Sequence, residues 1–372
     1  MKVKIDKVHL SQATTRCQGA VSDKTMGQIA IKAESSQMMM TASDRILSVY
    51  NSIDSEILRE GFVHVPARLF SDIVRELPDG PVILEKVRKS LVMTAGKQQE
   101  FVMKIPRLEV DEWRDVISIE AECFADLPAQ HLCYLIDQVQ CCVSYESARN
   151  YGSVAFFHRP KDDILRLVGT DGYRLSYAEL MLSLPPNFLS NGVCLSKRAL
   201  NELHRMASEG FETIRLAIAD DQSVILAETP GYQIYIRLSS VKYPKYQGVV
   251  PSFAPTPVNI SRQHFQSVAK RVLLASDKTK ALHLCFDSNM LTLKSRTLGS
   301  SEGKESIPLS DYDSEALQLA VNGKFLTDVF STISSPGVMM NFRSEDDPIV
   351  LRPRTEPDNC QSMHVLIPIR EN

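Results

Sequence analysis

The side chains that could support catalysis or metal binding are scattered along this chain. The eight histidines stand singly and no H-E-x-x-H pair occurs, so the helix-borne pair of imidazoles typical of a catalytic zinc site is missing. No G-x-S-x-G sequence marks a nucleophilic serine. The segment from Gly299 to Glu305 approaches a phosphate-binding loop, but it has one residue too few between its glycines and ends in Glu. We interpret it as a polar hairpin loop.

Two acidic sequences could in principle hold a metal ion. Asp171 precedes Gly172, and the run Glu345-Asp346-Asp347 precedes a proline. A metal-dependent enzyme acting on nucleic acid would need such carboxylates to converge around an open coordination position. For Asp171 we favour a D-G turn between strands, and for the acidic run a solvated turn. We therefore expect no catalytic residues, no metal and no cofactor, and we keep the metal-dependent enzyme as the alternative hypothesis.

The cysteines and the hydropathy pattern bear on the compartment. The eight cysteines are irregularly spaced and form no C-x-x-C pair, which predicts reduced thiols, several of them buried, in a cytoplasmic protein. They are Cys17, Cys123, Cys133, Cys141, Cys142, Cys194, Cys285 and Cys360. The N-terminus lacks the apolar segment of a secretory signal, and no run approaches the roughly 18 apolar residues of a membrane-spanning helix. We expect a cytoplasmic protein with no membrane partner.

A threefold repeat organises the elements that must position these side chains. Segments 65–77, 195–207 and 321–333 align without gaps, and their starts are 130 and 126 residues apart. Each carries a basic residue at its fourth position and apolar residues at the spacing of an amphipathic helix. The basic residues are Arg68, Arg198 and Lys324. Such a long period indicates repeated domains, because solenoid repeats are much shorter.

Each repeat also contains a second helix and several strands. The second helices begin near residues 9, 131 and 264. Alternating apolar and polar residues predict strand pairs in 26–43, 153–170 and 281–296, and closing strands at 101–106, 232–240 and 364–370. We therefore predict an α+β protein of three tandem domains of similar topology. The predicted boundaries are 1–122, 123–252 and 253–372, the last near a proline-rich linker.

The charge is unevenly distributed over the predicted elements. The chain of 372 residues has 42 Lys plus Arg against 45 Asp plus Glu, a net charge of -3, with ordinary globular proportions of 44% apolar and 23% charged residues. Ten basic and five acidic residues lie in the six predicted helices, so these carry +5 and the remainder carries -8. The helix windows are 9–20, 66–78, 130–142, 196–208, 262–276 and 323–334. This division favours a basic helix face that meets a polyanion, although solvated helix faces also favour Lys and Arg.

Four segments resemble motifs of one known family. They read VPARLFSDIVRELPDG at 65–80, TDGYRL at 170–175, YPKYQGVVP at 243–251 and VLIPIR at 365–370. In this order they are similar to segments of the bacterial β sliding clamp, the processivity subunit of the replicative DNA polymerase. The resemblance implies domains with helices on one side and antiparallel sheets on the other. Two chains would join head to tail into a closed ring that encircles duplex DNA without sequence specificity.

The resemblance also implies three sets of functional residues. A groove between domains two and three would bind short peptides of the polymerase, the clamp loader and repair proteins. Its wall would comprise Thr170, Gly172, Tyr173, Arg174, Leu175, Pro244, Val249, Asn322, Phe325, Val365, Ile367, Pro368, Ile369 and Arg370. The DNA-facing residues would be Lys24, Arg68, Arg75, Arg149, Tyr151, Lys197, Arg198 and Arg205. The homodimer contact would pair Phe101 and Met103 with Leu273 and Leu274 in a helix of domain three.

The chain departs from the family pattern in four places. Gly152 and Gly248 stand where we expect a larger apolar residue and an arginine, and Pro348 replaces a small polar residue. The tail ends Arg370-Glu371-Asn372, where the family pattern ends in Arg-Leu. We expect the groove still to bind peptides of the Q-x-x-L-F type, with an altered preference.

Overall fold

The computed structural model places the chain in two compact units. It describes residues 1–21, 27–44, 46–96, 100–110, 119, 121, 123–219, 221, 223–251, 257–297, 299–310, 312 and 315–370. The first unit comprises Met1–Leu127 with Phe211–Leu238, and the second comprises Pro128–Gly210 with Ser239–Asn372. Three residues of the sequence analysis, Lys24, Glu371 and Asn372, lie outside the described residues. None of the helices that the structure describes is long and apolar enough to cross a membrane.

The first unit contains two antiparallel sheets. A five-stranded sheet has the order β5 (Glu56–Arg59), β1 (Lys2–Asp6), β7 (Pro81–Val87), β8 (Ser90–Ala95) and β9 (Phe101–Pro106). An eight-stranded sheet has the order β10 (Phe124–Pro128), β15 (Thr213–Ile218), β16 (Val224–Thr229), β17 (Tyr232–Arg237), β4 (Leu47–Asp54), β3 (Gln37–Ser43), β2 (Gln28–Glu34) and β6 (Gly61–Pro66). The larger sheet therefore joins strands of the first and second predicted domains.

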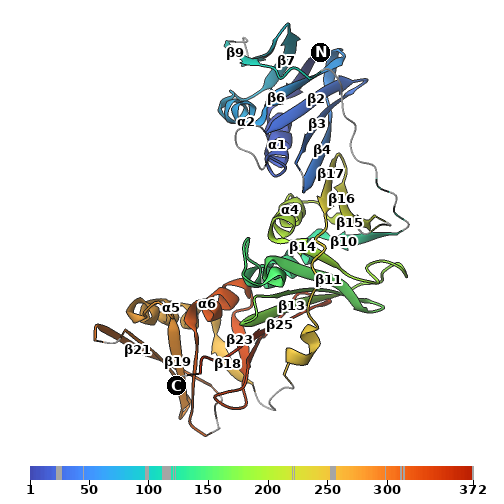
Figure 1. Ribbon diagram of the computed structural model, residues 1–372. Coiled ribbons are helices and arrows are strands. Elements are labelled where there is room, and N and C mark those ends of the chain that lie inside the picture. The colour runs from blue at the N-terminus through green and yellow to red at the C-terminus, as the bar shows by residue number, and fades with distance from the viewer. Residues whose placement is uncertain are drawn as a thin grey trace. The chain divides into compact units, whose positions relative to one another are not determined.

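Helices α1 (Lys7–Gln18) and α2 (Ala67–Glu76) cover one face of the larger sheet and pack against each other (Figure 1). Asp6 begins α1, because its carboxylate accepts a hydrogen bond of 2.8 Å from the Val8 amide. Pro66 precedes the first turn of α2, where its fixed φ suits a helix start. Leu10 and Phe70 are buried on the helix faces that meet the sheet, as the periodic apolar pattern predicts.

The second unit repeats this plan. Its eight-stranded sheet has the order β14 (Val193–Ser196), β11 (Val154–Lys161), β12 (Ile164–Thr170), β13 (Arg174–Met181), β25 (Cys360–Leu366), β24 (Ile349–Pro353), β23 (Gly337–Asn341) and β18 (Val258–Ser261). Its four-stranded sheet has the order β21 (Ser301–Pro308), β20 (Met290–Thr297), β19 (Ala281–Asp287) and β22 (Leu317–Asn322). Here the larger sheet joins strands of the second and third predicted domains.

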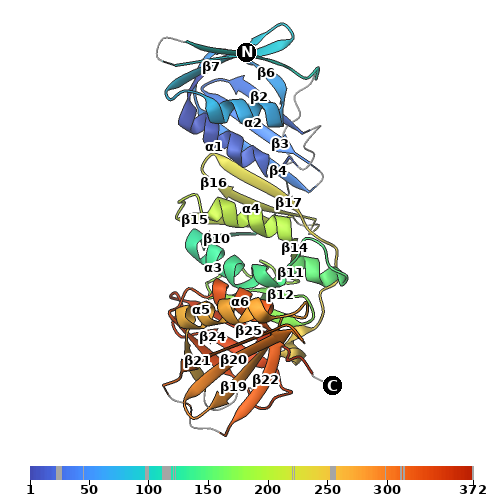
Figure 2. The same ribbon diagram turned by 90° about the vertical axis from the view of Figure 1, so that its left-hand side faces the viewer.

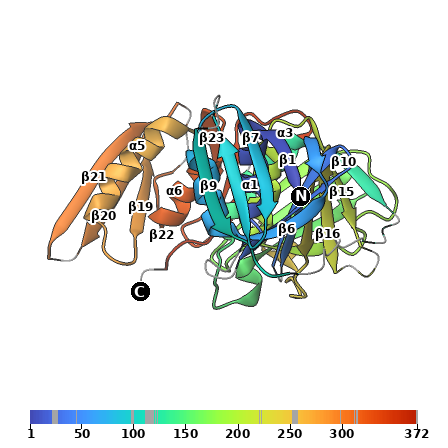
Figure 3. The same cartoon turned by 90° about the horizontal axis from the view of Figure 1, so that it is seen from above.

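In the described part of the second unit, four helices and four short 3-10 turns accompany the sheets. Helices α3 (Ala129–Val139) and α4 (Lys197–Ala207) pack together, as do α5 (Arg262–Val272) and α6 (Gly323–Thr332) (Figure 2). Helix α5 lies along β20 and β21 of the four-stranded sheet (Figure 3). The 3-10 turns are η1 (Gln140–Cys142), η2 (Asn150–Ser153), η3 (Tyr246–Val249) and η4 (Leu273–Ala275). The core beneath α5 and α6 is apolar and includes Phe265 stacked on Phe330.

The same strand joint occurs twice. The third strand after the first helix of one repeat pairs with the last strand of the next repeat: β4 with β17, and β13 with β25. Both pairs are antiparallel, with Tyr232 opposite Asn51 in the first and Arg174 opposite Leu366 in the second. The equivalent strands left over are β21 and β9, and each is an edge strand of its sheet.

The sequence-based elements are largely confirmed, with three corrections. All six predicted helices are present. The supposed hairpin loop 299–305 is wrong in part, because residues 301–308 form β21 and pair with β20. The closing strand of the third repeat is Cys360–Leu366, earlier than predicted, since the chain after it leaves the sheet at Pro368. The helix charge does not all face solvent, because Arg16 is buried and its guanidinium lies 4.2 Å from the centre of the Tyr232 ring.

All eight cysteines are free, and Cys17, Cys142, Cys194 and Cys360 are buried.

Candidate functional site

The turn between β12 and β13 is built by Asp171. One carboxylate oxygen accepts hydrogen bonds from the amides of Tyr173 (2.9 Å) and Arg174 (3.0 Å), and the Thr170 hydroxyl accepts one from the Gly172 amide (3.1 Å). Gly172 has φ +88°, a left-handed conformation that favours glycine, and a Cβ atom there would also force the Arg149 guanidinium to move. The predicted D-G turn is confirmed. The other oxygen of Asp171 accepts from Arg174 Nε at 3.0 Å, so both carboxylate oxygens have partners within the protein.

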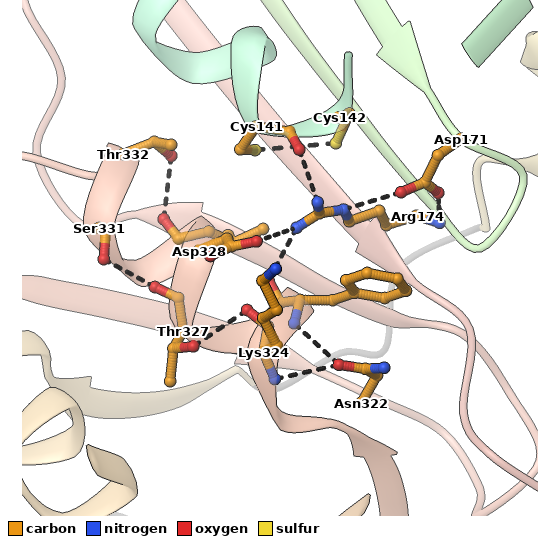
Figure 4. Close-up of polar contacts among 12 residues, drawn as sticks. Cys141, Cys142, Asp171, Arg174, Asn322, Lys324, Thr327, Asp328, Ser331 and Thr332 are labelled. Carbon is orange, nitrogen blue, oxygen red and sulfur yellow. Dashed lines mark hydrogen bonds and ion pairs between the residues drawn. The ribbon is translucent and has the colours of Figure 1, made fainter. Parts of the chain in front are cut away.

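Arg174 is buried, and its guanidinium group links three elements of the second unit (Figure 4). Beyond its contact with Asp171, Nη1 donates to Asp328 of α6 at 3.0 Å and Nη2 donates to the Cys141 carbonyl of η1 at 2.6 Å. Its guanidinium also lies 4.3 Å from the centre of the Phe325 ring. The sequence analysis placed Arg174 in a groove wall, whereas the structure turns its charge inward. The residue therefore fixes the position of the turn that carries Tyr173.

Exposed apolar side chains gather where β13 begins and β25 ends. Tyr173 is 59% exposed and Ile367 is 54% exposed, and the Ile367 amide donates to the Tyr173 carbonyl at 3.0 Å. The Tyr173 ring centre lies 6.3 Å from that of Phe325. Beneath them Leu175 pairs with Val365, and both are buried. The structure thus brings these members of the predicted groove together, with an apolar floor and exposed anchors.

The segment 243–250, which we call the strap, carries two further predicted groove residues. The Tyr243 hydroxyl donates to the Val168 carbonyl at 3.1 Å, and the Tyr246 ring packs into the cluster that contains Leu175 and Val365. Pro244 is half-buried and Val249 is 57% exposed. The strap is held from beneath by Arg166, whose Nη1 donates to the Tyr246 hydroxyl at 2.8 Å.

The remaining predicted groove residues make contacts that stabilise the local structure. Asn322 begins α6, because its side chain accepts hydrogen bonds from the amides of Lys324 (3.0 Å) and Phe325 (3.2 Å). After β25, the buried Pro368 is followed by Ile369, whose amide donates to the Ala320 carbonyl at 2.7 Å. Arg370 is exposed and lies 3.6 Å from Asp346. This contact and the Ser344 hydroxyl, which donates to Asp347 at 2.9 Å, give two carboxylates of the acidic run partners within the protein. No group of three metal-ligating side chains occurs in the described ranges.

The predicted DNA-facing residues fall into two groups. Arg68 and Arg75 are exposed on α2 and line a hollow of about 300 Å³ together with Gln18 and Ser71. Arg75 also lies 3.5 Å from Asp72. These two arginines project from the helix surface as the repeat predicts.

The other predicted DNA-facing residues that the structure describes are half-buried or contact another side chain of the protein. Lys197 donates to the Gln140 carbonyl, and burial lowers the pKa of its ammonium group. Arg205 pairs with Glu202 of the same helix, while Arg198 and Tyr151 are half-buried. Arg149 lies over the Tyr173 ring, 5.2 Å from its centre, and so belongs spatially to the groove turn.

Sequence reasoning missed an exposed aromatic residue beside α4. Tyr145 is exposed, and its hydroxyl accepts a hydrogen bond of 2.6 Å from the Asn201 amide group. Tyr145 lies in a polar stretch after α3 with no periodic pattern, so the sequence offered no signal for it.

The predicted dimer residues lie at the two leftover edge strands. Phe101 and Met103 are on β9, where Met103 is exposed and Val102, which the sequence analysis missed, is 63% exposed. Leu273 and Leu274 lie in η4 and not in α5 itself, because the α-helix ends at Val272. Leu274 is 84% exposed, and η4 packs against β21.

The chain matches known proteins over nearly its whole length. Family models for the N-terminal, central and C-terminal domains of the DNA polymerase III beta subunit match residues 1–116, 126–245 and 247–370. The chain belongs to the bacterial beta sliding clamp family.

Individual members of the clamp family are distant in sequence and close in fold. The beta sliding clamp of Caulobacter vibrioides is 23% identical, with both chains covered in full, and that of Halalkalibacterium halodurans is 25% identical over 98% of each chain. The DNA polymerase sliding clamp of Pseudomonas aeruginosa superposes with a TM-score of 0.88 at 21% identity, with full coverage of both chains. The clamp of Bartonella birtlesii bound to griselimycin superposes with a TM-score of 0.90 at 24% identity, again in full.

Membership of the clamp family decides between the two functional hypotheses. The predicted clamp fold is confirmed, and the protein is a processivity subunit without a catalytic site of its own. The alternative of a metal-dependent enzyme is therefore wrong. The individual site residues stay predictions.

The two glycines that depart from the family pattern differ in their surroundings. A Cβ atom at Gly152 would collide with the Ser147 side chain, so a larger residue there requires Ser147 to move. At Gly248 no described heavy atom lies within 4 Å of the Cβ position, so the surface beside Val249 is open. The strap therefore lacks the long cationic side chain that we expected there.

Proposed function

We propose that two copies of this chain close head to tail into a ring that slides on duplex DNA. The observation that carries this proposal is the repeated strand joint. Two of the three equivalent joints are made within the chain, by β4 with β17 and by β13 with β25. The third pair of equivalent strands, β21 and β9, are both edge strands, and in the proposed ring the β9 of each chain pairs with the β21 of the other. A head-to-tail contact of this kind forms a closed ring when its rotation closes after a whole number of copies.

The two edge strands are chemically suited to this joint. Unpaired strand edges expose amides and carbonyls that pair readily with another strand. Val102 and Met103 place apolar surface at β9, and Leu274 places apolar surface beside β21. Antiparallel pairing of β9 with β21 would bury this surface and satisfy both edges, as the two internal joints do.

The helices supply the face that meets DNA in this proposal. The six α-helices contain eleven basic and five acidic residues, although Arg16 is buried. Exposed cations such as Arg68 and Arg75 would contact phosphates, which carry no sequence information. A ring held by topology needs only weak contacts to slide, so a modest positive charge suffices.

The groove around Tyr173 and Ile367 would recruit the partners. A peptide in extended form needs apolar pockets and a few fixed polar groups, and the turn at Asp171, the strap and the end of β25 offer both. The relative from Bartonella birtlesii binds griselimycin, which supports a ligand site in this family. We infer that the replicative polymerase, the clamp loader and repair proteins bind here through short peptides. With such partners, the protein would act in the bacterial cytoplasm.

The test is retention on DNA of different topology. The protein is loaded by its cognate clamp loader onto a nicked circular plasmid, which is then purified by gel filtration. We expect the protein to stay with the circle and to leave after a single restriction cut. Equal retention on circular and linear DNA would show ordinary binding and would refute the ring.

A further inference from the structure

Two adjacent cysteines form a dithiol that the proposed clamp function does not use. Cys141 and Cys142 lie in η1, directly after α3, and their sulfur atoms are 3.8 Å apart. Both are free thiols. Cys142 is buried with its sulfur 3.1 Å from the Ser176 hydroxyl oxygen, whereas Cys141 is half-buried. Cys141 is thus the more exposed of the two thiols, and the second thiol lies directly beside it.

The surroundings give the two sulfur atoms different roles. The thiol of Cys142 can donate to the sulfur of Cys141, and this hydrogen bond together with the positive charge of Arg174 lowers the pKa of Cys141. Burial raises the pKa of Cys142 well above its ordinary value. The thiolate is the reactive form of cysteine, so Cys141 is the attacking sulfur and Cys142 is the resolving one.

We propose that Cys141 and Cys142 are a site of reversible oxidation, at which a peroxide converts the dithiol into a disulfide. The Cys141 thiolate attacks one peroxide oxygen, so an S–O bond forms as the O–O bond breaks, and the departing hydroxide takes up a proton to become water. The Cys142 thiol then loses its proton and attacks the sulfenic sulfur. The S–S bond forms, the S–O bond breaks and a second water leaves. Two thiols lose two electrons in total, and hydrogen peroxide is reduced to two waters.

Oxidation would change the hydrogen bonds of Arg174 by moving the backbone of the two cysteines. The ring closed by the disulfide contains the peptide unit between the two cysteines, and the carbonyl of that unit is the one that accepts from Arg174 Nη2 at 2.6 Å. Adjacent Cα atoms are about 3.8 Å apart, closer than the roughly 4.4–6.8 Å of ordinary disulfides, so ring closure strains this peptide unit and we infer that its carbonyl shifts. Arg174 then loses one of its hydrogen-bond acceptors, the Cys141 carbonyl.

Loss of this hydrogen bond should also weaken peptide binding in the groove. Arg174 holds Asp171 in the turn that presents Tyr173, and it holds Asp328 of α6. A displaced guanidinium releases the turn, so the oxidised protein should bind groove peptides more weakly. This last step rests on the proposed peptide-binding function, whereas the oxidation site does not.

The oxidation site is tested by peptide mapping. The reduced protein is treated with hydrogen peroxide and digested without reducing agent, and the peptide with both cysteines is weighed. We expect it to lose the mass of two hydrogen atoms, and to regain it with dithiothreitol. Cys142→Ser should instead give a sulfenic acid at Cys141 that dimedone traps, and Cys285→Ser, at a half-buried thiol elsewhere, should behave like the parent. Oxidation of Cys285 while the pair stays reduced would overturn the proposal.

The link to the groove is tested with a Q-x-x-L-F peptide. Its affinity is measured by fluorescence anisotropy for reduced, oxidised and re-reduced protein. We expect about tenfold weaker binding after oxidation, recovered on reduction, since one charge-assisted hydrogen bond is lost. An intact disulfide with unchanged affinity would refute the link. A reduced protein that binds no peptide would refute the groove itself, and the mapping would still decide on the oxidation site.

Discussion

Truncation of Leu274 should open the ring. This side chain is 84% exposed in the single chain and lies beside β21, so nearly all of its area is available for burial against β9 of a second copy. Leu274→Ala removes three carbon atoms, each worth about 0.8 kcal/mol when buried, which amounts to about 2 kcal/mol per joint. A ring of two copies has two joints, so the loss is about 4 to 5 kcal/mol. The dimer dissociation constant should rise roughly a thousandfold.

Sedimentation velocity over a range of concentrations measures this constant. Leu58 provides a matched control, because it is an exposed leucine on β5, the opposite edge of the sheet that ends in β9. Leu58→Ala should leave the dimer unchanged. If Leu274→Ala dimerises as tightly as the parent, or if Leu58→Ala weakens the dimer equally, the assignment of β9 and β21 to the joint is refuted.

Three further predictions concern the groove, the exposed arginines of α2 and the buried imidazole of His364. Ile367→Ala should weaken a Q-x-x-L-F peptide by roughly tenfold in anisotropy titrations, because an exposed anchor contact is lost, while Met181→Ala, an exposed position at the far end of β13, should have no effect. Replacing Arg68 and Arg75 by alanine should lower the slope of log affinity against log salt for a short duplex by roughly two, about 0.9 for each phosphate contact. Burial lowers the pKa of His364 to about 3, so the unfolded chain binds the extra proton first, and stability should fall as the pH drops from about 6.5 towards 3. In urea melts, His364→Gln should flatten that part of the profile.

Each of these has a clear contrary result. Equal peptide affinity of Ile367→Ala and the parent would remove Ile367 from the groove. An unchanged salt slope would show that the two α2 arginines face away from phosphate. An unchanged pH profile in His364→Gln would mean that other groups titrate over that range.

The helices were predictable because their signals are local. The segment 65–77 combines Pro66 at its start with apolar residues at helical spacing, and the structure forms α2 there. The turn at 170–174 was equally readable, since Asp171 and Gly172 supply its hydrogen bonds and its positive φ within five residues. In both cases the deciding interactions lie within a few positions of one another.

Features that depend on distant partners were not predictable. Residues 301–306 are polar on both faces, so they lack an alternating pattern, and they form β21 only through pairing with β20. Arg16 reads as a surface cation, yet it stacks on Tyr232 from a strand more than two hundred residues away. Arg149 was assigned to DNA, and only the fold shows it against Tyr173. A sequence pattern shows the type of each side chain. It does not show which distant ring or carboxylate that side chain contacts in the fold.

The central claim is that the two leftover strands, β9 and β21, join two chains into a ring. Sedimentation equilibrium of the unmodified chain at micromolar concentration tests it most directly. We predict a single species of about twice the chain mass of 41.7 kDa. A monomer, or an open series of growing oligomers, would contradict it.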